Sequence, residues 1–142
     1  MDKVHVIYGS TTGMTEAVAK KIAAALGCTA VNINAADATA FDAELLVLGS
    51  STWGVGDLQD DWMAQLDGVK ANFAGKKVAA FGLGESVGFA DSFCVAAETL
   101  ATTAKDAGAT LVGDVLKLDD MNESDQTDGK IAAWVETLKA AL

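Results

Sequence analysis

A run of glycine and hydroxyl residues lies near the N-terminus, between an apolar segment and a segment with helical periodicity. Its sequence is Gly9-Ser10-Thr11-Thr12-Gly13-Met14-Thr15. Backbone N–H groups at the start of a helix, together with these hydroxyl groups, can converge on one anion, and a phosphate monoester fits. A turn that only caps the helix is the alternative. The run contains no Lys or Arg and lacks the Gly-Lys-Ser/Thr of a Walker loop, which argues against nucleoside triphosphate chemistry.

Two further glycine-rich segments each contain an aromatic residue. Trp53 lies within Ser50-Ser51-Thr52-Trp53-Gly54-Val55-Gly56-Asp57, and Phe89 lies within residues 82–94. Each segment follows an apolar run of strand length, where sheet packing cannot easily bury a ring, so both rings are candidate stacking platforms. For Trp53 the alternative is a core position into which the loop folds. The segment 82–94 superficially resembles a dinucleotide fingerprint, but its third Gly is one position late and it follows the fourth apolar run.

The strands and helices around these segments must bring them together. Apolar runs of strand length occur at 3–8, 29–32, 44–49, 77–82 and 110–116. Segments with apolar residues at helical spacing occur at 18–26, 62–69, 97–104 and 131–142, and residues 37–41 are expected to form only a short or irregular crossover. This alternation predicts an α/β fold, a doubly wound five-stranded parallel sheet with helices on both faces. Ligands of such sheets bind at the carboxyl ends of the strands, so the three segments are expected at one edge.

The composition narrows the possible functions. The 142 residues contain no internal repeat or linker, so a single domain, 1–142, is expected. The net charge of −10 and the absence of Arg argue against a nucleic-acid surface. No apolar run approaches the ~18 residues of a membrane span, and the N-terminus carries no secretory signal, so we expect a cytoplasmic protein without membrane insertion. Cys28 and Cys94 have no CxxC spacing, so no metal site is expected.

Acidic residues are unevenly distributed along the chain. They gather in three stretches without a nearby base, which contain Asp57, Asp60, Asp61 and Asp67, then Glu85, Asp91 and Glu98, then Asp119, Asp120, Glu123, Asp125 and Asp128. One interpretation is a solvated acidic surface, and the other is a field that attracts proteins with basic docking surfaces. His5, the only His, lies within the first apolar run, so we predict that it is structural and that the chain has no catalytic residues.

An anion site and two loop aromatics at neighbouring strand ends together describe a site for a planar aromatic ring that carries a phosphate, and FMN satisfies that description. At these residues the chain resembles the flavodoxins. Residues 10–15 resemble their Ser/Thr-x-Thr-Gly-x-Thr phosphate loop, residues 51–54 the loop whose Trp covers one face of the flavin, and residues 82–94 the loop that covers the other face. The resemblance covers the length of the chain, and the last strand lacks the insertion of long-chain members, as in the short-chain group.

The resemblance implies a low-potential one-electron carrier with non-covalently bound FMN, rather than an enzyme. It implies cycling mainly between the semiquinone and the hydroquinone, and electron transfer between redox proteins, both reductases and acceptors. We also expect a monomer. The implied cofactor-binding residues are Ser10, Thr11, Thr12, Gly13, Met14, Thr15, Ser51, Thr52, Trp53, Gly54, Val55, Gly84, Glu85, Phe89, Asp91, Phe93 and Cys94.

Two positions depart from the family pattern. Met14 replaces a frequent Asn, and Phe89 replaces the usual stacking Tyr.

Two other functions compete with that of an electron carrier. A flavin-dependent quinone or azo reductase of the same fold would need a substrate site over the ring, but Trp53 and Phe89 are expected to cover both faces. A phospho-receiver domain would need an acidic pair after the first strand, where this chain has Gly9 and Ser10.

Overall fold

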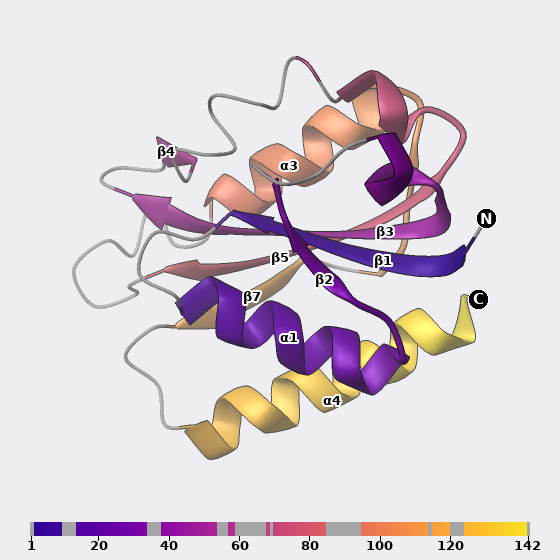
Figure 1. Ribbon diagram of the computed structural model, residues 1–142. Helices are drawn as coiled ribbons and strands as arrows, with labels where there is room; N and C mark the ends of the chain where they lie inside the picture. Colours follow the sequence, from indigo (N-terminus) through magenta and orange to yellow (C-terminus); the bar gives the residue numbers. More distant parts are fainter. Residues whose placement is uncertain are drawn as a thin grey trace.

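The structure is built on one β-sheet with helices on both of its faces (Figure 1). This computed structural model describes residues 2–9, 14–33, 38–53, 57–58, 68, 70–84, 95–113, 115–119 and 124–141. None of the helices in these ranges is long and apolar enough to cross a membrane.

The strands of the sheet follow the predicted doubly wound order. Four of them, β2 (Ala30–Asn32), β1 (Asp2–Gly9), β3 (Ala43–Trp53) and β5 (Lys77–Gly84), lie side by side in the order β2-β1-β3-β5. The strands β6 (Thr110–Leu111) and β7 (Leu116–Asp119) both pair with β5 and together occupy the fifth place. These pairings are parallel, whereas β4 (Asp57–Leu58) pairs antiparallel with β3. The predicted five-stranded parallel sheet is therefore confirmed.

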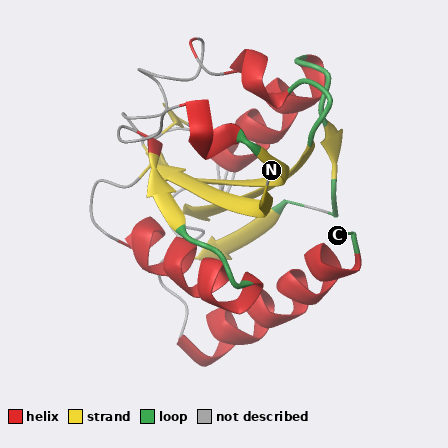
Figure 2. Ribbon diagram, turned by 45° about the vertical axis from the view of Figure 1, so that its right-hand side comes forward, coloured by secondary structure: helices red, strands yellow, loops and turns green. Residues whose placement is uncertain are grey.

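Helices cover both faces of this sheet. Figures 1 and 2 show α1 (Met14–Leu26) and α4 (Ser124–Ala140) on one face and α3 (Val95–Asp106) on the other. The short 3-10 helices η2 (Ala38–Phe41) and η3 (Lys70–Phe73) lie on the α3 side, where Phe41 and Phe73 pack together. Successive strand residues point to opposite faces. Leu45 and Val47 of β3 accordingly join the apolar cluster under α1 and α4, and Leu46 joins the cluster under α3.

Three strands differ in length or continuity from the sequence prediction. The strand predicted at 44–49 continues to Trp53, because Ser50 and Ser51 still pair with β5 and the last two residues pair with β4. The strand predicted at 77–82 likewise continues to Gly84. The strand predicted at 110–116 is interrupted after Leu111, since Gly113 has φ 66°, a left-handed conformation that a strand cannot contain, and pairing resumes from Leu116. The predicted helix at 62–69 lies outside the described residues, apart from residue 68.

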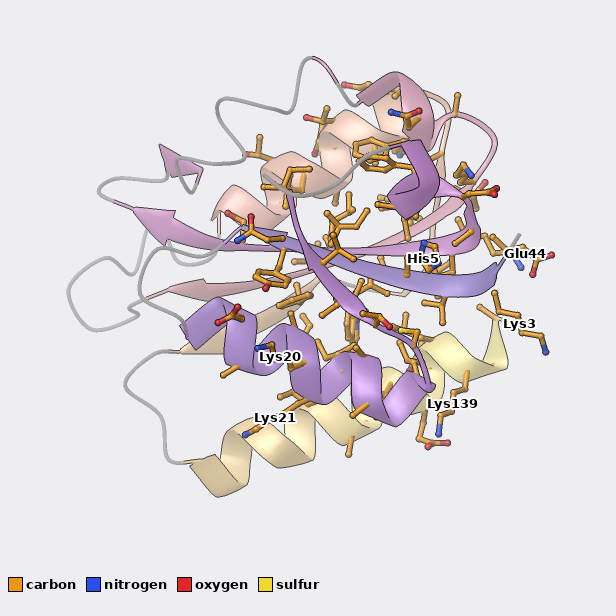
Figure 3. All side chains as sticks on the ribbon, in the orientation of Figure 1. Lys3, His5, Lys20, Lys21, Glu44 and Lys139 are labelled. Carbon is orange, nitrogen blue, oxygen red and sulfur yellow. The ribbon has the colours of Figure 1, made fainter. Side chains whose placement is uncertain are left out.

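The amino-terminal edge of the sheet is fastened by side chains that bond to backbone carbonyls. His5 Nδ1 lies 2.8 Å from the carbonyl oxygen of Ala40, which joins β1 to η2 and supports the predicted structural role of this histidine. Lys77 Nζ donates to the carbonyl oxygen of Ala141 at 2.7 Å, which joins β5 to the end of α4. Figure 3 shows Lys3 and Glu44 at this same end of the sheet.

Gly49 of β3 lies at a crowded point under the helices. Its register partners are Tyr8 of β1 and Phe81 of β5. A Cβ atom built on Gly49 would lie 2.0 Å from Cζ of Phe81. The Phe81 ring is fully buried, and it meets the Trp134 ring edge-on with the centroids 6.1 Å apart. The ring therefore occupies the space of the missing side chain and is itself held in place from the α4 side.

We predict that Gly49→Ala destabilises the fold by about 1–3 kcal/mol, because the added methyl group overpacks a core that cannot shift freely. Gly68→Ala is the matched control, since Gly68 is exposed and a Cβ there meets nothing within 4 Å. Urea unfolding of both variants measures the difference. In a double-mutant cycle, Phe81→Leu should relieve part of the Gly49→Ala penalty, and strict additivity of the two changes would show that Phe81 is not the obstacle.

Candidate functional site

The three segments that the sequence analysis singled out leave the sheet at one edge. Gly9, the last residue of β1, is the register partner of Ser50 in β3, and Ser50 is the partner of Gly82 in β5. Because these strands are parallel neighbours, their carboxyl ends are level with one another. Figure 1 shows the ends of β3, β5 and β7 and the start of α1 on the same side of the molecule. The sequence-based expectation that the three segments share an edge is confirmed.

The last row that β1, β3 and β5 share contains only small residues. Gly9, Ser50 and Gly82 lie side by side across these three strands, and the row continues in β7 with Lys117, the partner of Gly82. Gly9, Ser50 and Gly82 are buried, and Ser50 is the one buried polar residue among the described side chains. Because these three residues have small side chains or none, the backbone of β1, β3 and β5 forms the surface of the edge there. Such a surface suits close approach of a flat ligand to the main chain.

The strand β3 projects beyond its neighbour β1. It continues for three residues past the Gly9–Ser50 pair, and its end pairs with β4 in the registers Thr52–Leu58 and Trp53–Asp57. The backbone of Trp53 is therefore held in a two-stranded ladder at the edge, not in an unpaired loop as the sequence predicted. This pairing also places the backbone of Asp57 opposite Trp53, so an aromatic and an acidic residue are neighbours in the ladder.

The helix α1 begins close to the end of β1 in sequence. Only residues 10–13 separate Gly9 from Met14, the first residue of this 13-residue helix. A helix N-terminus presents unpaired N–H groups and the positive end of the helix dipole, both of which favour an anion. The phosphate segment predicted at residues 10–15 thus ends in the first turn of a long helix, as the sequence analysis required.

The predicted site residues divide into two groups. The described backbone places Met14 and Thr15 at the start of α1, Ser51, Thr52 and Trp53 at the end of β3, and Gly84 at the end of β5. The others lie outside the described residues: Ser10, Thr11, Thr12, Gly13, Gly54, Val55, Glu85, Phe89, Asp91, Phe93 and Cys94. The six described positions all lie at the carboxyl edge.

Tyr8 and Glu16 form a contact beside this edge that the sequence analysis missed. The Tyr8 hydroxyl donates a 2.8 Å hydrogen bond to Oε1 of Glu16. Glu16 lies in the first turn of α1, and its carboxylate is also 3.7 Å from Nζ of Lys20. The signal in the sequence is the position of a tyrosine and a glutamate on either side of a hydroxyl-rich turn, although neither residue is unusual by itself.

The surroundings of Tyr8 disfavour its ionised form. Its side chain is 5% exposed and belongs to the apolar cluster under α1 and α4. Burial, followed by the hydrogen bond to Glu16 and the charge of that carboxylate, raises the pKa of Tyr8 to about 12. Tyr8 therefore remains a hydrogen-bond donor at neutral pH.

Metal ligands do not gather in the part of the chain that the structure describes. No group of three or more His, Cys, Asp and Glu residues there could hold a metal ion. Cys28 is half-buried against the apolar cluster under α1 and α4, and it is not part of a disulfide. Burial raises the pKa of its thiol, which lowers its reactivity as a nucleophile.

We predict that Tyr8 of the native protein titrates near pH 12, whereas in the unfolded chain it titrates near pH 10. Because folding raises this pKa, the stabilising contribution of the neutral phenol is complete below pH 10 and is lost as the pH rises towards 12. Tyr8 is the only tyrosine, so the ultraviolet absorbance of tyrosinate reports this residue alone. Titration of the native chain beside the chain in denaturant makes the comparison. Coincident curves would contradict the prediction.

Known proteins resemble this chain over nearly its whole length. The family model described as Flavodoxin matches residues 6–134. Among curated proteins, the flavodoxin of Trichodesmium erythraeum (strain IMS101) is 36% identical over an alignment of 168 positions, which covers 98% of this chain and 97% of that protein. Flavodoxin 1 of Azotobacter vinelandii is 34% identical over an alignment of 169 positions, with the same coverage of both chains.

Solved structures give the same result. Oxidised Flavodoxin 1 from Bacillus cereus superposes with a TM-score of 0.82 at 27% identity, over 97% of this chain and 98% of that one. The Fusobacterium nucleatum flavodoxin bound to flavin mononucleotide superposes with a TM-score of 0.89 at 23% identity, over 100% of this chain and 99% of that one, a likeness of fold. Together with the family match and the doubly wound sheet, these similarities show that the chain belongs to the flavodoxin family.

Proposed function

We propose that this chain is a one-electron carrier that binds one FMN non-covalently in its single domain, residues 1–142. The observation that carries the proposal is that the three adjacent parallel strands preceding the three predicted segments end level at one edge, in a chain that belongs to the flavodoxin family. One segment offers hydroxyl groups and a helix N-terminus, and the other two each offer an aromatic ring. A phosphorylated, flat aromatic cofactor matches this combination.

The described residues fit such a cofactor. Four residues separate the end of β1 from the start of α1, which suits a phosphate bound by N–H and hydroxyl groups without any Arg. The small residues Gly9, Ser50 and Gly82 form the surface of the edge in β1, β3 and β5. The Fusobacterium nucleatum flavodoxin of the same fold was solved with flavin mononucleotide bound. In this chain we assign the phosphate to residues 10–15.

The remaining assigned residues surround the ring. We assign its two faces to Trp53 and Phe89, both of which can stack on an aromatic system. The further ring contacts are assigned to Ser51, Thr52, Gly54, Val55, Gly84, Glu85, Asp91, Phe93 and Cys94. The backbone pairing of Trp53 with Asp57 supports the first assignment, because it fixes the backbone of Trp53 at the carboxyl edge.

The chain contains one histidine and 20 acidic residues. Bound FMN would supply the electron-accepting ring, and the surrounding residues would set its potential. The backbone places Asp57 at the start of β4 beside Trp53 and Asp119 at the end of β7 beside Gly84. Negative charge at this edge opposes the addition of an electron. It supports the finer proposal of a low-potential carrier that cycles mainly between the semiquinone and the hydroquinone.

The proposed partners are redox proteins, both reductases and acceptors, with basic docking surfaces, and the proposed carrier is a cytoplasmic monomer. The chain has 20 acidic residues against 10 lysines. Complementary charge mainly speeds encounter and selects the partner, and this effect declines with salt. A flavin-dependent reductase of the same fold remains the competing function, and it would need access for a nicotinamide or substrate over the ring.

A spectrum of the purified protein during stepwise reduction tests the proposal. We expect one FMN per chain on release of the cofactor, a semiquinone stage during titration, and no rapid oxidation of free NAD(P)H. Release of FAD would contradict the cofactor assignment. Rapid turnover of NAD(P)H by the flavin-loaded protein would instead favour the reductase.

We predict that Thr12→Val weakens FMN binding about tenfold or more, because a hydroxyl donor to a charged group is worth about 1.5–3 kcal/mol. Thr137→Val is the matched control, since the Thr137 hydroxyl bonds only locally, to the carbonyl oxygen of Ala133 at 3.3 Å on α4. Titration of each variant with FMN, followed by flavin fluorescence, gives the dissociation constants. Equal affinity in the two variants would remove Thr12 from the site.

We predict that Asp57→Asn combined with Asp119→Asn raises the lower of the two flavin potentials. A unit charge about 10 Å away contributes about 0.4 kcal/mol in water, or on the order of 20 mV per charge. Asp42→Asn combined with Asp106→Asn removes the same charge from the opposite edge, before β3 and at the end of α3, and should change the potential less. Redox titration with optical detection measures both. Equal shifts of the flavin potential in the two double variants would show that the potential depends on the net charge of the protein and not on the position of the carboxylates.

A further inference from the structure

The Tyr8–Glu16 hydrogen bond connects the two elements on either side of the predicted phosphate segment. Tyr8 is the next-to-last residue of β1, and Glu16 is the third residue of α1. The 2.8 Å bond between the phenol and the carboxylate therefore spans residues 9–15. It is a side-chain link between the end of the strand and the start of the helix.

Each partner is fixed from its own side. Tyr8 pairs with Asn32 of β2 and with Gly49 of β3, and its ring is buried in the apolar cluster that includes Val18 of α1. Glu16 belongs to the helix and lies 3.7 Å from Lys20, with 41% of its side chain exposed. The hydrogen bond thus joins a rigid strand to a more exposed first helical turn. Its geometric effect is to hold the start of α1 at a set position relative to the end of β1.

The phenol is well suited to this task at neutral pH. Burial and the neighbouring carboxylate keep Tyr8 protonated far above neutrality, so it always offers its proton to Glu16. A bond from a neutral hydroxyl to a carboxylate is stronger than one between two neutral groups. The link is consequently present before any ligand arrives.

We propose that Tyr8 and Glu16 are positioning residues for the phosphate of the cofactor, an inference that rests on the proposed FMN function. Their hydrogen bond holds the first turn of α1 in the place that its N–H groups need for anion binding. A site that is ordered in advance does not lose free energy in becoming ordered on binding. Without the link, the first turn must be fixed by the phosphate itself, and affinity for the phosphate falls.

The test compares FMN with riboflavin, which has the same ring but no phosphate. The full chain, freed of flavin, is titrated with each ligand, and quenching of flavin fluorescence gives the dissociation constants. We expect Tyr8→Phe to weaken FMN binding about fivefold to tenfold and riboflavin binding by less than twofold. A general loosening of the protein would weaken both ligands equally, and this result would overturn the proposal.

Substitutions of Glu16 provide a second route that does not touch the core. Glu16→Ala should reproduce the loss in Tyr8→Phe, and Glu16→Gln, which keeps an oxygen acceptor, should recover part of it. In the double variant with Tyr8→Phe, the Glu16→Ala change should add little, because the bond is already absent. Independent, additive losses would overturn the proposal even if Tyr8→Phe folds poorly.

Glu136 offers a matched control for the loss of charge. It also lies on a helix with its carboxylate 3.7 Å from a lysine, Lys139, but this pair is close to the end of α4. Glu136→Gln should leave the ratio of FMN to riboflavin affinity unchanged. If wild-type protein binds neither flavin, the proposed function fails. If it binds FMN and the ratio is the same in Tyr8→Phe as in Glu136→Gln, only the positioning role fails.

Discussion

The parallel register of β1, β3 and β5 is the constraint on which the rest of the structure depends. Because Gly9, Ser50 and Gly82 are neighbours in one row, everything that follows these strands in sequence starts from the same edge. Strands whose last shared residues are more than thirty positions apart in sequence thereby end at one edge. In the proposed site, loops carry the chemistry, and the sheet determines where each loop starts.

Side-chain packing next to the carboxyl edge stabilises the register of β1, β3 and β5. The Phe81 ring lies over Gly49 and against Trp134, so an aromatic residue from β5 and one from α4 close the core next to the last row of the sheet. A larger residue at position 49 would overlap the Phe81 ring. The glycine at this position therefore follows from core packing, whereas Gly9 and Gly82, in the next row, belong to the edge itself. Glycines in neighbouring rows of the sheet thus have different physical causes.

The parallel sheet, the helices on both of its faces and the common edge could be predicted from the sequence, because apolar periodicity reports burial directly and its alternation between strand and helix patterns indicates parallel strands. The ends of elements could not. The extension of β3 to Trp53 depends on pairing with β4, and the interruption before Leu116 follows the positive φ of Gly113, both of which are tertiary properties. The Tyr8–Glu16 bond was missed for a related reason. Neither residue is unusual by itself, and only the strand-to-helix turn brings their side chains together.

The two edges of the sheet differ in the backbone groups that they expose. The helices α1, α3 and α4 follow β1, β5 and β7, so each begins at the carboxyl edge and ends near the amino edge. Lysines meet the C-termini of α3 and α4 there: Lys105 and Lys139 lie in last turns, and Lys77 bonds to the carbonyl oxygen of Ala141. The N–H groups of the first helical turns, which have no partner within the helix, lie at the carboxyl edge. An acidic chain without Arg can therefore accept an anion at this edge, because the attraction comes from the backbone and not from basic side chains.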